Sequence, residues 1–162
     1  MALPHELAQF PAIEQSAGEA FRPTHHGWVA DDENSPPEAY APLQADGLVW
    51  VAEADGELIG FGAGEAFEDA IHLWELAVAH AHQGRGAGRA LMAALVEEAG
   101  QRRAPAITLT TFSDIPWNAP FYARLGFEIL AQPNARLEAT LAKETARGLT
   151  SRCAMRLALR RP

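Results

Sequence analysis

The chain has 162 residues, of which 48% are hydrophobic and 21% charged, a composition typical of one globular domain spanning residues 1–162. Its net charge of -8 argues against a nucleic-acid partner, because a basic face is needed to displace counterions from phosphates. A single cysteine excludes an internal disulfide, and no stretch approaches the length that crosses a bilayer, so we expect a cytoplasmic protein with no membrane partner.

The first 47 residues predict one helix and a long, loop-rich segment. Apolar residues at helical spacing indicate a helix over residues 12–21, with Pro11 tolerated at its start. Residues 22–47 carry four prolines and the acidic cluster Asp31-Asp32-Glu33, which predicts loops and a short helix near residues 37–43.

Three strand-like runs follow and predict an antiparallel meander. Residues 48–54 and 58–67 are joined by Asp55-Gly56-Glu57, which is a hairpin signal, and residues 70–78 form the third run. Glycines at positions 60, 62 and 64 alternate on one face of the second run, where they leave space for another group to approach.

A glycine-rich segment, Gln83-Gly84-Arg85-Gly86-Ala87-Gly88-Arg89, separates the third run from a helical pattern that reaches residue 99. Such a turn leaves backbone N–H groups unpaired at a helix N-terminus, where the helix dipole adds positive potential, so it predicts a phosphate site. A dinucleotide fingerprint would need glycine at Arg89 or Leu91, and a P-loop would need a Gly-Lys pair that the chain lacks.

The helix after this loop is expected to end at Gly100 and to pack on the sheet through an apolar stripe. Its members are Leu91, Met92, Leu95, Val96 and Ala99. Residues 106–112 predict a strand parallel to the third run, which completes a βαβ unit.

The remaining elements predict a closed mixed sheet. Asn118 is expected to cap a short helix that ends at Gly126-Phe127. Strands at residues 127–131 and 153–159 should flank a helix at 135–146 that ends at Gly148, and Cys153 is expected to be a small core residue. The inward-facing residues of that helix are expected to be Leu137, Leu141, Ala142 and Thr145.

Two motifs, in this order, resemble the GNAT superfamily of N-acetyltransferases. Gln83-Gly84-Arg85-Gly86-Ala87-Gly88 fits its pyrophosphate pattern Q/R-x-x-G-x-G/A, and Trp117-Asn118-Ala119-Pro120-Phe121-Tyr122-Ala123-Arg124-Leu125-Gly126-Phe127 resembles its later motif. The resemblance implies a mixed α/β fold with a central, mostly antiparallel sheet, one splayed parallel strand pair, and helices on both faces. Residues 1–9, with Pro4 among them, leave open whether the first strand of that fold is present.

The resemblance also implies acetyl-CoA as co-substrate, with no metal. The thioester arm would pair with backbone of the strand before the loop, the loop N–H groups would hold the pyrophosphate, and two residues of the later motif would contact the cofactor. These implied cofactor-binding residues are Leu76, Ala77, Val78, Gln83, Gly84, Arg85, Gly86, Ala87, Gly88, Arg89, Asn118 and Phe121. Asn118 equally fits a helix cap and no more.

Tyr122 matches the motif tyrosine, so the resemblance implies a general acid toward the departing thiolate; otherwise it is a core aromatic. Glu75 interrupts an apolar strand, and the resemblance implies that it is the general base, directly or through water; otherwise it would form an ion pair across the sheet. The resemblance also implies an acceptor pocket involving Trp28 and Tyr40, which otherwise anchor a loop. His72 would join this pocket, as a proton relay if a bulge shifts the strand register, and otherwise is exposed or hydrogen bonded.

The chain is therefore expected to be an N-acetyltransferase that moves an acetyl group from acetyl-CoA to a primary amine by direct attack in a ternary complex. The acceptor would be a small-molecule amine or a peptide N-terminus, and a homodimer is left open. The alternative is a non-catalytic acyl-CoA-binding module. The pairs His25-His26 and His80-Ala81-His82 have no recognised ligand spacing and are expected to be solvated loop histidines.

Overall fold

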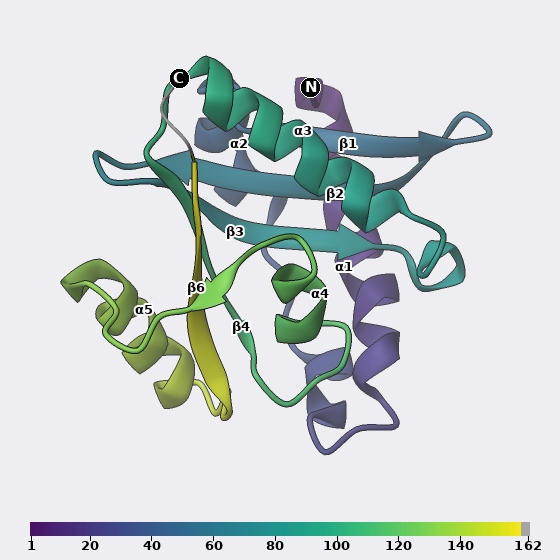
Figure 1. Ribbon diagram of the computed structural model, residues 1–162. Coiled ribbons are helices and arrows are strands. Elements are labelled where there is room, and N and C mark those ends of the chain that lie inside the picture. Colours follow the sequence, from purple (N-terminus) through teal and green to yellow (C-terminus); the bar gives the residue numbers. More distant parts are fainter. Residues whose placement is uncertain (160–162) are drawn as a thin grey trace. The chain divides into compact units, whose positions relative to one another are not determined.

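A computed structural model describes residues 1–159 and shows a six-stranded mixed sheet in the order β1-β2-β3-β4-β6-β5 (Figure 1). The strands are β1 (Val49–Ala54), β2 (Glu57–Ala66), β3 (Ile71–Val78), β4 (Ala106–Phe112), β5 (Glu128–Ile129) and β6 (Arg152–Ala158). The α-helices are α1 (Phe10–Gly18), α2 (Pro37–Ala45), α3 (Ala87–Gln101), α4 (Ala119–Ala123) and α5 (Ala135–Ala146). Short 3-10 turns are η1 (Pro4–Gln9), η2 (Glu19–Phe21), η3 (Gly27–Asp31) and η4 (His80–His82). The expected mixed α/β class is confirmed, with β3 and β4 as its parallel pair.

The chain divides into two compact units. The N-terminal unit comprises Met1–Glu65 and Trp74–Glu98, and the C-terminal unit comprises Ala66–Leu73 and the described residues from Ala99 onward. Strand β3 and helix α3 each contribute residues to both units. Within residues 1–159, no helix combines the length and apolar character needed to span a bilayer.

No strand precedes α1 in the part of the chain that the structure describes. The 3-10 turn η1 takes that place, and the N–H group of Leu3 donates to the side chain of Glu6 instead of to a strand. One ladder-like bond remains, from the N–H of Ala2 to the carbonyl of Val49 at 2.9 Å. Residues 1–9 therefore form no strand, in agreement with a segment interrupted by Pro4, which lacks an N–H donor.

The β1–β2 hairpin forms as predicted. Its two turn residues, Asp55 and Gly56, have φ values of 52° and 80°, which is the left-handed pair that a type I′ turn requires. On one face of the hairpin, Phe61 stacks on Phe10 of α1 with ring centroids 3.9 Å apart, and Tyr40 of α2 packs edge-on against both rings. Helix α3 crosses the other face (Figure 1).

The glycine row of β2 accommodates the indole of Trp50. A Cβ atom at Gly62 would lie 2.8 Å from that ring, and one at Gly60 would lie 2.8 Å from the carbonyl oxygen of Ala77. The indole Nε1 donates to the carbonyl of Leu91 in α3 at 2.7 Å, with Trp50 only 4% exposed. The space that the sequence predicts is thus filled by a side chain that joins the hairpin to α3.

Substitution Gly62→Ala is expected to lower the free energy of unfolding by about 1–3 kcal/mol, because the new methyl group must displace a buried indole. Urea denaturation measures this loss. Gly100→Ala is the matched control: it lies in α3, where a Cβ meets nothing within 4 Å, so it should be neutral or stabilising. Equal stabilities of the two variants would contradict the packing argument.

Helix α3 departs from its prediction in two respects. It continues through Gly100 to Gln101, because the left-handed residue that ends it is Arg103, with φ 56°, and the N–H of Ala104 bonds to the carbonyl of Ala99 at 2.9 Å. The stripe residues Leu91, Met92, Leu95 and Ala99 are buried as expected. Val96 is 37% exposed, so its assignment to the stripe was wrong.

The C-terminal unit is built on β4. Seven residue pairs join β4 to the antiparallel β6, which pairs with β5 on its other side. Helix α5 has the predicted bounds and is capped by the Asn134 side chain, which accepts from the N–H of Leu137 at 3.0 Å.

Helix α5 buries a different face from the one expected. Leu137 is buried, but Ala142 and Thr145 are exposed, so their inward assignment was wrong. Glu144 turns inward instead, because its carboxylate pairs with Arg152 at 2.9 Å and accepts from the hydroxyl of Thr110 at 2.6 Å. The neighbouring Cys153 is half-buried, and burial raises the pKa of its thiol, which suits a structural residue.

Candidate functional site

The glycine-rich loop of residues 83–89 enters α3 with two left-handed residues. Gly84 and Gly86 have φ values of 72° and 95°, and a Cβ at either would meet nothing within 4 Å. Backbone conformation rather than crowding therefore requires glycine at both positions. Residues 84–86 are exposed, and the first turn of α3 leaves its leading N–H groups without intrahelical partners. This is the geometry of an anion site at a helix N-terminus.

Gly88 differs from the two loop glycines, because it already lies in α3. An alanine fits a helical backbone without strain, whereas it is strained at Gly86. The structure thus explains why the pattern Q/R-x-x-G-x-G/A demands glycine at the position of Gly86 and accepts alanine at that of Gly88.

The side chain of Gln83 is directed into the protein. Its amide nitrogen donates to the carbonyl oxygens of Val78 at 2.9 Å and of Ala17 at 3.3 Å. Nearby, the N–H of His80 donates to the hydroxyl of Ser16 at 3.0 Å. Both contacts join the segment before the loop to the end of α1, and sequence reasoning missed Ser16 and Ala17 because they lie more than sixty residues earlier.

The end of β3 offers backbone to an extended ligand. Residues 71–73 pair with residues 107–109 of β4, and β3 then continues to Val78. Ala79 donates its N–H to Ile59 of β2 at 2.8 Å, so by alternation the N–H of Leu76 points away from β2. That N–H donates to the carboxylate of the adjacent Glu75 at 3.1 Å.

Tyr40 is a core residue with a polar end. It is 4% exposed, and its hydroxyl donates to Glu14 of α1, whose second carboxylate oxygen accepts from the N–H of Ser35 at 3.2 Å. Burial raises the pKa of Tyr40, and the negative charge of Glu75 raises it further. Burial also raises the pKa of Glu14. The ring anchors α2, while the hydroxyl lies within the influence of two carboxylates.

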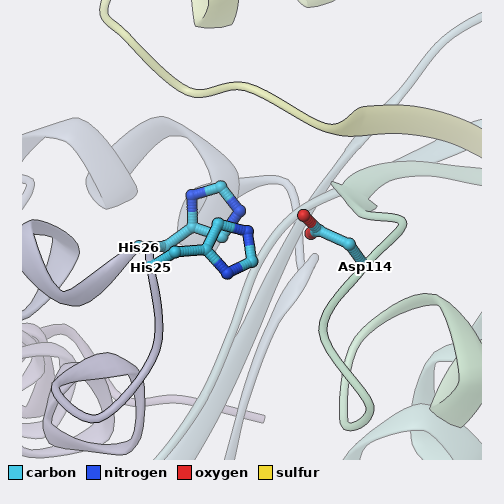
Figure 2. Close-up of side chains that lie close together, drawn as sticks. All are labelled: His25, His26 and Asp114. Atoms are coloured by element: carbon cyan, nitrogen blue, oxygen red, sulfur yellow. The ribbon is translucent and has the colours of Figure 1, made fainter.

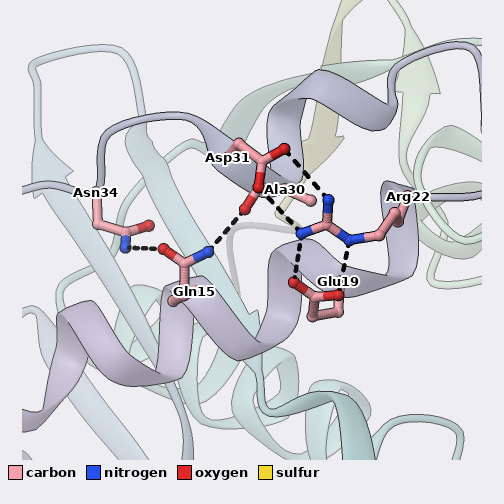
Figure 3. A network of polar contacts seen from close by, with 6 residues as sticks. All are labelled: Gln15, Glu19, Arg22, Ala30, Asp31 and Asn34. Atoms are coloured by element: carbon pink, nitrogen blue, oxygen red, sulfur yellow. Dashed lines mark hydrogen bonds and ion pairs between the residues drawn. The ribbon is translucent and has the colours of Figure 1, made fainter.

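Trp28 lies in η3, 40% exposed, on a segment fixed to α1 (Figure 3). Gln15 donates to the carbonyl of Ala30 at 2.7 Å and accepts from Asn34 at 3.1 Å. The guanidinium of Arg22 pairs with Glu19 at 2.7 Å and with Asp31 at 3.1 Å, and it lowers the pKa of both carboxyls. The six residues involved are Gln15, Glu19, Arg22, Ala30, Asp31 and Asn34. These contacts hold the segment that carries Trp28 in place.

His72 is fully buried in the C-terminal unit, at 0% exposure. Its Nδ1 lies 3.0 Å from the hydroxyl of Thr108, which is its register partner on β4. Burial lowers the pKa of His72 to about 3, and the charge of Arg136 lowers it further. The expectation that His72 is hydrogen bonded is confirmed, and the alternative that it is exposed is wrong. The imidazole is neutral at physiological pH.

This buried imidazole makes stability sensitive to acid. The pKa of His72 is lower in the folded chain than its ordinary value of 6.5, so the unfolded chain binds the proton first. The contribution of neutral His72 to the free energy of unfolding is present above pH 6.5 and is lost as the pH falls toward 3. Between pH 7 and pH 5 this group should remove about 2 kcal/mol of the free energy of unfolding. Urea denaturation checks it: the stability gap between wild type and His72→Gln should shrink by that amount, and a pH-independent gap would contradict it.

His25 and His26 stack against each other, with ring centroids 4.1 Å apart at a tilt of 43° (Figure 2). His26 is 2% exposed, so the expectation of a solvated histidine is wrong for it; His25 and His80 are exposed as expected, and His82 is half-buried. The third residue drawn, Asp114, follows β4 and belongs to the C-terminal unit.

Asn118 precedes α4 but does not cap it with its side chain. Its Oδ1 accepts from the hydroxyl of Thr111, at 2.8 Å, and Thr111 is 3% exposed. The backbone carbonyl of Asn118 starts the helix instead, accepting from Phe121 at 2.9 Å and from Tyr122 at 3.2 Å. The side-chain cap prediction was wrong, because Thr111 of β4, which the sequence analysis did not select, competes for the amide oxygen.

Tyr122 is half-buried between two aromatic neighbours. Its ring packs edge-on against Phe121 at 5.1 Å and against Phe127 at 5.8 Å. Gly126, with φ 93°, ends the segment, and the N–H of Phe127 returns to the carbonyl of Tyr122 at 3.1 Å, as the Gly-Phe stop predicts. The ring orientation of Tyr122 is thereby fixed.

The predicted site residues are distributed over both units. The loop residues 83–89, the strand residues Glu75, Leu76, Ala77 and Val78, and the aromatics Trp28 and Tyr40 belong to the N-terminal unit. His72, Asn118, Phe121 and Tyr122 belong to the C-terminal unit.

Residues 9–127 match the model of the acetyltransferase (GNAT) family, and the chain belongs to this family. L-2,4-diaminobutyric acid acetyltransferase of Nocardia farcinica is 31% identical over 94 residues, which are 54% of this chain and 49% of that protein. The chain thus matches about half the length of this curated relative.

Solved structures share the fold. Ribosomal-protein-S18-alanine N-acetyltransferase of Escherichia coli has a TM-score of 0.71 at 19% identity, covering 99% of this chain and 92% of that one. Rv2747 of Mycobacterium tuberculosis, in complex with CoA and NLQ, has a TM-score of 0.68 at 19% identity, covering 98% and 97%. The yncA protein of Salmonella typhimurium, solved with its cofactor acetyl-CoA, has a TM-score of 0.70 at 21% identity, covering 99% and 92%.

Proposed function

We propose that the chain is an acetyl-CoA-dependent N-acetyltransferase that acetylates a primary amine by direct attack in a ternary complex. The observation that carries the proposal is the loop at the end of β3, where two left-handed glycines precede the first turn of a fifteen-residue helix. Family membership and the fold shared with proteins solved with CoA or acetyl-CoA support it.

The proposed cofactor contacts fall into three sets. Backbone N–H groups of residues 84–89 would hold the pyrophosphate, with the helix dipole adding attraction. The thioester arm would extend along Leu76, Ala77 and Val78 and pair with the N–H of Leu76 in place of the Glu75 carboxylate. Asn118, whose oxygen is occupied by Thr111, would offer its amide nitrogen, and Phe121 would add apolar contact.

The chemistry requires one nucleophile and two proton transfers. The neutral amine nitrogen attacks the thioester carbonyl carbon, forming the C–N bond, and collapse of the tetrahedral adduct breaks the C–S bond. Tyr122 donates its phenolic proton to the departing thiolate, and Glu75, displaced from Leu76 by the arm, takes the proton of the attacking amine directly or through water. No covalent enzyme intermediate forms.

The acceptor would be a small amine or a peptide N-terminus. The relative from Nocardia farcinica is named for a diamino acid, and the Escherichia coli neighbour for an alanine of a ribosomal protein. Trp28 and the hydroxyl of Tyr40 are the proposed pocket contacts, with Glu14 and Glu75 favouring a cationic amine. His72, fully buried, would act on the pocket only through β3.

An acceptor screen tests the proposal. The purified full chain is incubated with acetyl-CoA and a panel of diamino acids, polyamines, aminoglycosides, amino acids and short peptides, while a thiol reagent reports CoA release. We expect saturable, amine-dependent release with at least one class. CoA binding without release for any amine would favour the non-catalytic acyl-CoA-binding module, and absence of CoA binding would overturn both functions.

A further inference from the structure

The side chain of Gln83 has no donor left for a phosphate. A carboxamide nitrogen carries two N–H donors, and that of Gln83 makes two contacts, with the carbonyls of Val78 and Ala17 at 2.9 and 3.3 Å. The residue is half-buried, whereas Gly84, Arg85 and Gly86, which follow it, are exposed. Gln83 therefore faces the protein while the loop that it begins faces solvent.

The two acceptors of Gln83 belong to different elements. Val78 is the last residue of β3, and Ala17 lies in the last turn of α1, where its carbonyl oxygen also accepts from the N–H of Glu19. The bond from the N–H of His80 to the Ser16 hydroxyl, at 3.0 Å, makes a second link to the same turn of α1. Three polar contacts thus hold the start of the loop against β3 and α1.

Helix α1 carries the proposed acceptor-side segments as well. Glu14 accepts from the hydroxyl of Tyr40 and the N–H of Ser35, and Gln15 donates to Ala30. All these residues belong to the N-terminal unit. Hydrogen bonds therefore connect the loop, through Gln83 and α1, to the segments that hold Trp28 and Tyr40.

We propose that Gln83 is a positioning residue that fixes the pyrophosphate loop to α1 and couples occupation of the loop to the acceptor side of the protein. This inference rests on the proposed function. It also explains why the family pattern accepts either Gln or Arg at this position: both side chains carry several N–H donors that reach two carbonyls, and charge is not what they share.

Three variants test the proposal, with CoA as the probe. Gln83→Met keeps the length and removes both donors, Gln83→Arg keeps donors and adds charge, and Ser16→Ala removes the second link. Calorimetry at low and high salt should show about tenfold weaker CoA binding for Gln83→Met and affinity within about threefold of wild type for Gln83→Arg. The salt dependence should be the same in wild type and both Gln83 variants. Tighter binding by Gln83→Arg with a steeper salt dependence would instead place this side chain on the phosphates and overturn the proposal.

Hydrogen exchange gives a readout of the coupling. CoA should slow amide exchange in α1 of the wild type, more weakly in Ser16→Ala and not in Gln83→Met, while protection of the loop persists in each. Equal α1 protection in wild type and Gln83→Met would overturn the proposal. If Gln83→Met does not fold, Gln83→Arg and Ser16→Ala decide the same question. A wild type that does not bind CoA would refute the proposed function itself, which is a distinguishable failure.

Discussion

Tyr122→Phe is expected to lower kcat by about 10²- to 10³-fold, because the thiolate then departs without a positioned proton donor. The ring of Tyr122 is held by Phe121 and Phe127 on two sides, so the phenylalanine should occupy the same position and leave the fold unchanged. Initial rates of CoA release at saturating acetyl-CoA, with the best amine from the screen, measure the effect. CoA affinity, measured by calorimetry, should stay within about threefold of wild type.

The chain offers one other tyrosine for comparison. Tyr40→Phe removes a hydroxyl bonded to Glu14, at a position proposed to contact the acceptor, so it should raise the KM for the amine more than it lowers kcat. The two Tyr→Phe variants thus separate proton donation from acceptor binding. If Tyr122→Phe retained the full kcat, Tyr122 would be an aromatic support of the motif, and the proton would come from elsewhere.

Gly86→Ala should weaken CoA binding by about 5- to 30-fold. A Cβ at φ 95° strains the backbone by about 1–2 kcal/mol, and relaxation of that strain turns the adjacent N–H groups away from the pyrophosphate. Isothermal titration of CoA gives the dissociation constant. The thermal midpoint should fall only slightly, because Gly86 is exposed and its Cβ would touch nothing within 4 Å.

Gly88→Ala is the control for this prediction, because Gly88 lies two residues further along, inside α3, where alanine is a better helix former. Its CoA affinity should remain within about threefold of wild type. Similar losses in both variants would mean that the added methyl groups block the ligand, and that backbone conformation at Gly86 is not the cause.

Elements specified by local signals were predicted closely. Helix α5 runs between Asn134, which caps it through its side chain, and Gly148, which has φ 90°, and β4 keeps its predicted bounds. The Asp55-Gly56 turn also depends only on its own two residues. In each case the deciding interaction lies within a few positions of the residue that signals it, so the local sequence is enough to predict the element.

Errors arose where a distant partner decides the outcome. Glu144 turns inward because it pairs with Arg152 and accepts a hydrogen bond from Thr110, so α5 buries a different face from the apolar one expected. Asn118 gives its oxygen to Thr111 and not to the helix that it precedes. The hydrophobic periodicity of the sequence predicts neither set of side-chain contacts.

The candidate site shows the same division. Its glycine loop and the Tyr122 motif could be located from residue types and spacing, because both depend on local backbone chemistry. The contacts of Gln83 with Ala17, and of Tyr40 with Glu14, could not, since these residues lie 66 and 26 positions apart and meet only in the folded chain. Sequence therefore located the proposed cofactor contacts better than the residues that support them.

The bond from Trp50 to Leu91 has a consequence for anion capture. The Trp50 indole crosses the glycine row of β2 and bonds to a carbonyl only one turn inside α3. We therefore expect this side chain of β1 to fix the distance between the sheet and the N-terminal, positive end of α3. Enlarging the row would tilt the helix and carry its leading amides out of reach of a bound diphosphate. Ligand affinity should then decline even in molecules that remain folded, and a substitution remote from the cofactor would resemble a binding defect in an activity assay.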